Sequence, residues 1–268
     1  MSEHTDKKLT QLKEYLAGLE GAVVAFSGGV DSTFLLAVAV EVLGDRVLAV
    51  TATSETYPER ERREAHELAR MLGVRHREVV SEELDLPEFK DNPRNRCYYC
   101  KKELFGKLRA IANAAGLAHV LDGTNVDDLG DHRPGREAAA ELGVLSPLVQ
   151  AGLTKEEIRQ LSQVMKLPTW DKPAYACLSS RFPYGTAITP DRVRQVGQAE
   201  EALRGLGFRV LRVRYHGEVA RLELGPDEFR QAVGELRDVV ADIVRKAGFI
   251  YVAVDLQGYR TGSMNEMD

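Results

Sequence analysis

Short apolar runs alternate with longer segments of helical periodicity through roughly the first half of the chain. The runs have the length and β-branched character of strands and cover residues 21–26, 46–52, 75–80 and 119–123. The segments between them predict helices over residues 32–43, 58–72, 101–115 and 134–142. Strands that alternate with helices form βαβ units, so the pattern predicts an α/β fold with a parallel sheet.

The pattern changes after residue 147. Thr154 and Glu157 form a capping box, which predicts a helix start, and a long irregular segment follows that helix. Beyond Thr189, which is expected to cap a helix, two strand-like runs flank His216-Gly217, and a helical segment and a last strand come after them. We therefore expect a smaller α+β domain after the first, with boundaries at 1–165, 166–188 (an active-site loop or linker) and 189–268.

Composition narrows the class of protein. The 268 residues carry a formal charge of -5, which is unlike the excess of basic residues in most dedicated nucleic-acid binders. The polar first 20 residues predict an amphipathic helix and lack the apolar core of a secretory signal. No apolar run approaches the roughly 18 residues that cross a bilayer, so we expect a cytoplasmic protein without a membrane partner.

A glycine-rich turn follows the first predicted strand directly. In this turn, SGGVDS, backbone N–H groups and the next helix N-terminus suit phosphate oxygens. Ser27 and Ser32 would add hydroxyl donors beside Gly28 and Gly29, and Asp31 would hold a magnesium ion that bridges phosphates. The alternative is a capped βα turn without a ligand, but six such residues between strand and helix favour phosphate binding.

The ends of two other predicted strands would lie at the same edge of the sheet. Small residues at the end of the second strand, Thr51 and Ala52, would let adenine approach the backbone. A cluster after the fourth strand would close the nucleotide site, and its residues are Gly123, Thr124, Asn125, Asp127, Asp128, Asp131, Arg133, Pro134 and Gly135.

The three cysteines of the chain are Cys97, Cys100 and Cys177. A Cys-x-x-Cys pair suits structural zinc, a redox pair or an iron-sulfur site, and zinc would need a fourth ligand such as His119 or His132. Three thiolates with one open position would suit a 4Fe-4S cluster. Three unrelated buried thiols are the alternative, which the polar flanking residues disfavour.

These motifs carry a resemblance to known families. SGGVDS resembles the PP-loop of the N-type ATP pyrophosphatases, which implies cleavage of ATP between the α- and β-phosphates and adenylation of a substrate oxygen. Together with CYYCK, LDGTNVDDLGDHRPG and ACLSSRFPYG, it resembles the LarE family of ATP-dependent sulfur transferases over nearly the whole chain. The resemblance implies a PP-loop (adenine nucleotide alpha hydrolase-like) domain and a C-terminal domain for substrate binding and oligomerisation.

The resemblance to this family also implies a substrate and cofactors. The substrate would be pyridinium-3,5-biscarboxylic acid mononucleotide, whose carboxylates are adenylated and converted to thiocarboxylates for the nickel-pincer nucleotide cofactor. ATP, Mg²⁺ and a 4Fe-4S cluster on the three cysteines would be the cofactors, with Cys177 at the sulfur site. A homo-oligomer and a sulfide or other sulfur donor are also implied, whereas family members with only the cysteine matching Cys177 sacrifice its sulfur.

Positively charged side chains are needed to bind the phosphate group of such a substrate. Arg212 and Arg214 alternate along a predicted strand and therefore share one face, and with Ser180 and Arg181 they would form an anion clamp. A solvated charged face is the alternative. Weaker acidic candidates in the same part of the chain are Glu200, Glu201 and Asp227.

Two other functions remain open at this point. A PP-loop tRNA thiolase would share the loop and the three cysteines, but it would need a basic surface for RNA. A nucleotide-binding module without catalysis is the second alternative, and the complete SGGVDS with Asp31 disfavours it.

Overall fold

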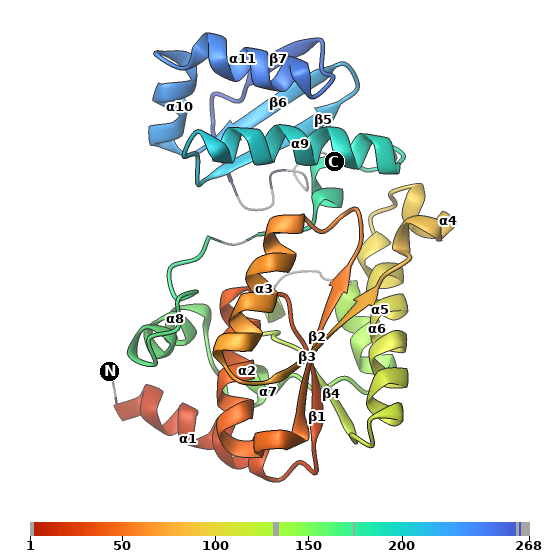
Figure 1. Ribbon diagram of the computed structural model, residues 1–268, viewed down its shortest axis with the longest axis vertical. Coiled ribbons are helices and arrows are strands. Elements are labelled where there is room, and N and C mark those ends of the chain that lie inside the picture. The colour runs from red at the N-terminus through yellow and green to blue at the C-terminus, as the bar shows by residue number, and fades with distance from the viewer. Residues whose placement is uncertain (1–2, 131–133, 174, 261–262, 264–268) are drawn as a thin grey trace. The chain divides into compact units, whose positions relative to one another are not determined.

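The computed structural model describes residues 3–130, 134–173, 175–260 and 263, which form two compact units (Figure 1). Unit 1 comprises Met1–Glu83 and Asn95–Tyr175, and unit 2 comprises Leu84–Arg94 and Ala176–Asp268. The chain passes from unit 1 to unit 2 for the last time after Tyr175, which lies within the segment 166–188 that was expected to be a loop or linker. The sequence pattern does not predict that Leu84–Arg94 belongs to unit 2. No helix in the described ranges is long and apolar enough to cross a membrane.

Unit 1 is built on a four-stranded parallel sheet of order β3-β2-β1-β4. Its strands are β1 (Ala22–Ala25), β2 (Val47–Thr53), β3 (Arg75–Val80) and β4 (His119–Leu121). The central strand β1 pairs in parallel with both β2 and β4, so the carboxyl ends of the strands meet at one edge. This arrangement confirms the α/β class, and it brings the loops after the strands together.

Helices cover both faces of this sheet (Figure 1). One core contains side chains of α1 (Glu3–Ala17), α2 (Val30–Leu43), α3 (Glu59–Met71), the single turn α7 (Pro147–Gln150) and α8 (Lys155–Val164). The core on the other face is formed with α5 (Arg96–Ala114) and α6 (Gly135–Glu141). Helix α2 is buried on nearly all sides, and its apolar run from Phe34 to Ala39 fixes the helix that follows the glycine turn.

Unit 2 is the α+β unit that the pattern predicts. Its main elements are α9 (Pro190–Gly205), β5 (Leu211–His216), β6 (Val219–Leu224), α10 (Pro226–Val233), α11 (Arg237–Lys246) and β7 (Tyr251–Val254), with the short α4 (Pro87–Lys90) from the earlier segment. Strands β5 and β6 form the expected hairpin, and β7 pairs in parallel with β6. The expected helical segment is two helices, because Gly234 (φ -102°, ψ -112°) leaves the helical conformation.

Candidate functional site

The glycine turn Ser27–Ser32, called the PP-loop below, joins β1 to α2 at the carboxyl edge of the sheet. Gly28 has a φ of +67°, and a Cβ atom there would lie 3.2 Å from Cα of Ala65 in α3, so only glycine fits this turn. The Oγ atoms of Ser27 and Ser32 are 3.1 Å apart, and Ser32 Oγ also accepts the backbone N–H of Ser27 at 3.3 Å. The two hydroxyls therefore close the loop on itself and keep it compact at the helix N-terminus.

Asp31 lies in the first turn of α2 with its two carboxylate oxygens in different surroundings. Lys155 Nζ donates to Oδ2 at 2.5 Å, whereas Oδ1 is buried without a hydrogen-bond partner in the part of the chain that the structure describes. An uncommitted carboxylate oxygen beside a phosphate-binding turn is the kind of ligand that Mg²⁺ prefers. The residues present therefore fit a magnesium ion, and Asp31 would hold it.

The side chain of Thr51, near the end of β2, is buried and already hydrogen-bonded within the protein. Thr51 is 1% exposed, and its hydroxyl donates to the carbonyl of Phe26 at 2.7 Å. Its only hydrogen is then used, so Nε2 of His76, 2.9 Å away, donates to Thr51 Oγ1. Burial and the neighbouring His66 hold the pKa of His76 below its ordinary value. Thr51 thus links β2 to the residue that follows β1 and to the beginning of β3, and Ala52 beside it is half-buried.

The loop after β4 approaches the PP-loop through a glycine. A Cβ atom on Gly123 would lie 3.0 Å from the backbone nitrogen of Ser32, so a larger residue would push the two loops apart. Thr124 donates from its backbone and its hydroxyl to Asp122, at 3.2 and 2.8 Å, and Asn125 is 3% exposed. The structure brings Gly123 to the PP-loop, while Thr124 shapes its own turn. Three candidates of this segment lie outside the described residues: Asp131, His132 and Arg133.

Cys97 and Cys100 lie in the first two turns of α5, not before the helix as the pattern predicts. Residues three apart share a helix face, so the two thiols are neighbours. Cys97 is exposed and Cys100 is half-buried, and a Cβ on Gly135 would lie 3.3 Å from the carbonyl oxygen of Cys97. Cys177 is exposed and belongs to unit 2. Among the residues described, no three His, Cys, Asp or Glu side chains are grouped to hold a metal.

Arg181 is fully buried beneath the segment that carries Cys177. Its Nε and Nη2 donate to the two carboxylate oxygens of Glu200 at 2.7 and 2.9 Å. Its Nη1 donates to the carbonyls of Ala176 and Cys177 at 2.9 and 3.2 Å and to Ser180 Oγ at 2.7 Å. Burial opposes the charged form of Glu200, but the charge and hydrogen bonds of Arg181 outweigh it and hold the pKa of Glu200 below its ordinary value. Arg181 therefore fixes the backbone around Cys177.

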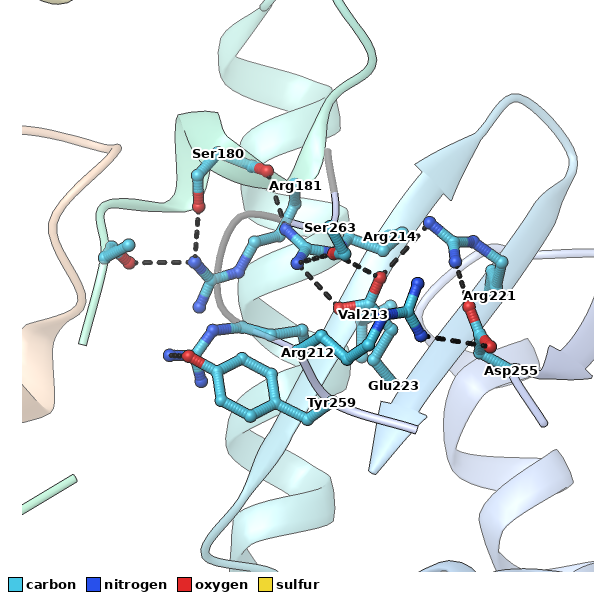
Figure 2. Close-up of polar contacts among 12 residues, drawn as sticks. Ser180, Arg181, Arg212, Val213, Arg214, Arg221, Glu223, Asp255, Tyr259 and Ser263 are labelled. Atoms are coloured by element: carbon cyan, nitrogen blue, oxygen red, sulfur yellow. Dashed lines mark hydrogen bonds and ion pairs between the residues drawn. The ribbon is translucent and has the colours of Figure 1, made fainter. Parts of the chain in front are cut away.

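Arg212 and Arg214 lie on one face of β5, as their alternation predicts (Figure 2). Both are 5% exposed. Arg214 donates to the carbonyl of Ser180 at 2.8 Å and to Glu223 Oε2 at 2.6 Å, while its Nε is buried with no hydrogen-bond partner among the described atoms. The Arg212 guanidinium lies over the ring of Tyr259, 4.8 Å from its centre. The structure thus brings Ser180, Arg181 and Arg214 together in unit 2.

Arg221 extends this group across the hairpin (Figure 2). It is paired with Asp255, and its Nη2 lies 3.2 Å from Glu223 Oε1. The three guanidinium groups, Arg212, Arg214 and Arg221, are called the arginine cluster below. With Arg260, whose Nη1 lies 4.0 Å from Asp255 Oδ1, the positive charges here outnumber the two carboxylates. Such an excess, partly removed from water, suits an anionic group.

Two of the acidic candidates lie away from this group. Glu201 is exposed, and Asp227 pairs with Arg230 at the surface at 3.2 Å. Only Glu200, through its contact with Arg181, belongs to the site. Lys155 is a residue that the sequence pattern did not single out, because its partner Asp31 lies 124 residues earlier in the chain.

A phosphate-binding glycine turn at the carboxyl edge of a parallel sheet, with a carboxylate in the first turn of the next helix, places the protein in the PP-loop class of ATP-dependent enzymes. In agreement, residues 20–119 match the asparagine synthase family. The chain is 41% identical over 267 residues to the pyridinium-3,5-bisthiocarboxylic acid mononucleotide synthase of Lactiplantibacillus plantarum, covering 99% of this chain and 96% of that protein. It therefore belongs to the LarE family of that synthase.

Two further proteins are similar to this chain. An uncharacterised protein of Synechocystis is 43% identical over 263 residues, which is 98% of each chain. The NH(3)-dependent NAD(+) synthetase of Aeropyrum pernix is 30% identical over 173 residues, which is 59% of this chain and 58% of the synthetase. The first similarity extends through both units, whereas the second covers only part of the chain.

Proposed function

We propose that the protein is an ATP-dependent sulfur transferase in the biosynthesis of the nickel-pincer nucleotide cofactor. It adenylates the carboxylates of pyridinium-3,5-biscarboxylic acid mononucleotide and converts them to thiocarboxylates, with release of AMP and pyrophosphate. The observation that carries the proposal is the near full-length similarity to the synthase of Lactiplantibacillus plantarum. The PP-loop in unit 1 and the arginine cluster in unit 2 supply groups that this chemistry needs.

Adenylation requires ATP to be held by its phosphates while a carboxylate oxygen attacks the α-phosphorus. The PP-loop amides and the N-terminus of α2 bind the phosphates, and Asp31 holds the magnesium ion, which supplies charge compensation when bound. Lys155 is already within 2.5 Å of Asp31, so its ammonium group lies where it also balances the charge of departing pyrophosphate. Adenine binds against the backbone of Thr51 and Ala52, near the end of β2.

The arginine cluster binds the phosphate of the mononucleotide substrate. Arg212 and Arg214 come from one strand face, and the buried Nε of Arg214 is an uncommitted donor in the described structure. Ser180 is held beside them by Arg181 and Arg214. Arg181 itself acts through the backbone, because its guanidinium is directed at Glu200 and at the carbonyls around Cys177.

The sulfur atom reaches the activated carboxylate at Cys177. We propose that Cys97, Cys100 and Cys177 would hold a 4Fe-4S cluster, which would supply the sulfur for the transfer. The two thiols in the first two turns of α5 fit this role, because they share a helix face near the positive end of the helix dipole. The displaced group is AMP, a far better leaving group than oxide. A sulfide source and a homo-oligomer belong to the same proposal.

The test is anaerobic turnover with ATP, Mg²⁺, sulfide and the biscarboxylic mononucleotide. We expect pyrophosphate, AMP and a product whose mass shows oxygen replaced by sulfur, together with bound iron. Pyrophosphate release that does not depend on the mononucleotide would refute the substrate. Salt-dependent binding of tRNA would instead favour a tRNA thiolase.

A further inference from the structure

Two side chains from outside the PP-loop hold its backbone carbonyls. The hydroxyl of Tyr57 donates to the carbonyl oxygen of Ser27, and Nζ of Lys172 donates to that of Gly28 at 3.2 Å. Tyr57 precedes α3 in the chain, and Lys172 follows α8. Both contacts lie within unit 1.

Lys172 is held in place by two glutamates of α3 as well as by the PP-loop. Its Nζ lies 2.8 Å from Glu61 Oε2 and 2.7 Å from Glu64 Oε2, and these two residues are on successive turns of α3. An ammonium group has three hydrogens, and two carboxylates and the carbonyl of Gly28 accept all three. The Lys172 side chain is 16% exposed, so this contact is shielded from competition by water. The two glutamates thus determine where the ammonium group lies.

Tyr57 is held in its protonated form by the same surroundings. Burial, followed by the charges of Glu61 and Glu64, raises the pKa of Tyr57 above its ordinary value. The hydroxyl therefore keeps the proton that it donates to the loop. Burial alone raises the pKa of Glu64, but the hydrogen bonds of Lys172 and Arg60 outweigh it and lower that pKa. The negative charge that acts on Tyr57 thus persists.

The direction of these contacts determines where the loop amides point. No cis peptide bond occurs among the described residues, and in a trans peptide the carbonyl oxygen and the next N–H point in opposite directions. The Ser27 carbonyl fixes the N–H of Gly28, and the Gly28 carbonyl fixes the N–H of Gly29. The loop packs on α3 at Ala65, and Lys172 is itself bound to α3, so the Gly28 carbonyl is drawn toward that helix. The N–H of Gly29 consequently faces away from α3.

We propose that Tyr57 and Lys172 are positioning residues that orient the Gly28 and Gly29 amides toward the phosphates of ATP. Neither residue needs to touch the nucleotide. Without them, a carbonyl oxygen can rotate toward the phosphates, where its partial negative charge repels them. The inference rests on ATP binding at the PP-loop, which pyrophosphate release by the unaltered protein tests separately.

The first experiment uses Tyr57→Phe, which removes one hydroxyl and keeps the ring. We expect affinity for ATP, measured by calorimetry with an analogue that cannot be cleaved between the α- and β-phosphates, to fall about tenfold, as for one lost hydrogen bond. Affinity for adenosine, which has no phosphate, should stay unchanged. Tyr251→Phe, at a side chain exposed in unit 2, is the matched control and should change neither affinity.

The second experiment uses Lys172→Met and Lys172→Arg. Because the methionine leaves Glu61 without its lysine and Glu64 with Arg60 alone, the same comparison is repeated with both glutamates changed to Gln, which removes the two negative charges together. We expect each Met variant to raise the KM for ATP more than it lowers kcat, and the Arg variant to retain much of the ATP affinity. A general weakening of the fold would lower ATP and adenosine affinities alike. Equal losses for the two ligands, or unchanged ATP affinity in folded Tyr57→Phe and Lys172→Met proteins, would overturn the proposal.

Discussion

Replacing Glu200 by Gln isolates the charge that holds Arg181 beneath Cys177. The variant keeps the size of the side chain and one acceptor oxygen, but it leaves a guanidinium that is 0% exposed without its counter-charge. Removing one partner of a buried ion pair costs about 3–5 kcal/mol. Each kcal/mol shifts Tm by about 2–4 °C in proteins near the size of the whole chain, so the unfolding transition of the protein should fall by roughly 6–20 °C.

The neighbouring residue supplies a matched control. Glu201 is exposed, so Glu201→Gln removes the same charge from α9 and should change the free energy of unfolding by less than about 0.5 kcal/mol. The single tryptophan, Trp170, lies in unit 1 and does not report on unit 2. We would therefore follow urea unfolding by hydrogen exchange in peptides from α9 and β5. A loss for Glu200→Gln as small as that of the control would refute the buried-pair argument.

The pH dependence of the same variant gives a second check with a definite sign. The pKa of Glu200 is depressed in the folded protein, so the stability it contributes is fully present above the pKa of an unfolded glutamate, about 4.3. That contribution is lost as pH falls through the lower, folded value. The difference in unfolding free energy between the unaltered protein and Glu200→Gln should therefore shrink in acid, as urea titrations at several pH values would reveal.

Three further predictions concern the proposed chemistry. Asp31→Asn should abolish pyrophosphate release while the circular dichroism spectrum stays unchanged, because it removes the magnesium ligand at nearly constant volume; normal release would exclude that role. Arg212→Ala and Arg214→Ala should each weaken mononucleotide binding by about 1.5 to 3 kcal/mol and ATP binding much less, and calorimetry showing equal loss of both ligands would point to a structural role. Cys97→Ser should lose iron and repeated turnover together, whereas one turnover that leaves dehydroalanine at Cys177, seen by mass spectrometry, would establish the sacrificial route.

Local sequence signals predicted much of the fold because they act over a few residues. The capping box at Thr154 is present as expected, with its hydroxyl and Glu157 satisfying each other's backbone groups. The start of α5 was predicted too late, since Asn95 at its N-cap makes no side-chain cap hydrogen bond and the Cys-Tyr-Tyr-Cys run has only modest helix propensity. The segment 226–246 was expected to be one helical stretch, but Gly234 ends α10 and divides it into two helices.

Contacts between distant residues had no such signal. Lys155 and Asp31 are 124 residues apart, and Lys172 and Gly28 are 144 apart, so neither pair follows from local spacing. The alternation of Arg212 and Arg214 predicted a shared strand face correctly, but their burial depends on what packs over β5. Arg181 was expected beside these two as an anion ligand, and only tertiary structure reveals that Glu200 turns its guanidinium inward.

The assignment of Leu84–Arg94 to unit 2 also affects how the chain folds during its synthesis. The amide of Asn92, which is 0% exposed, donates to the carbonyls of Phe182 and Pro183 at 3.3 and 2.7 Å, and these partners lie 90 and 91 residues later. At about 5–20 residues per second, a ribosome needs roughly 5–18 s to produce them. Throughout that interval the segment is tethered to a sheet that it does not join, and Leu84 and Phe89, which are buried in the folded protein, are exposed to water. A nascent chain arrested after Tyr175 should therefore recruit chaperones at this segment even though every strand of the parallel sheet is already present.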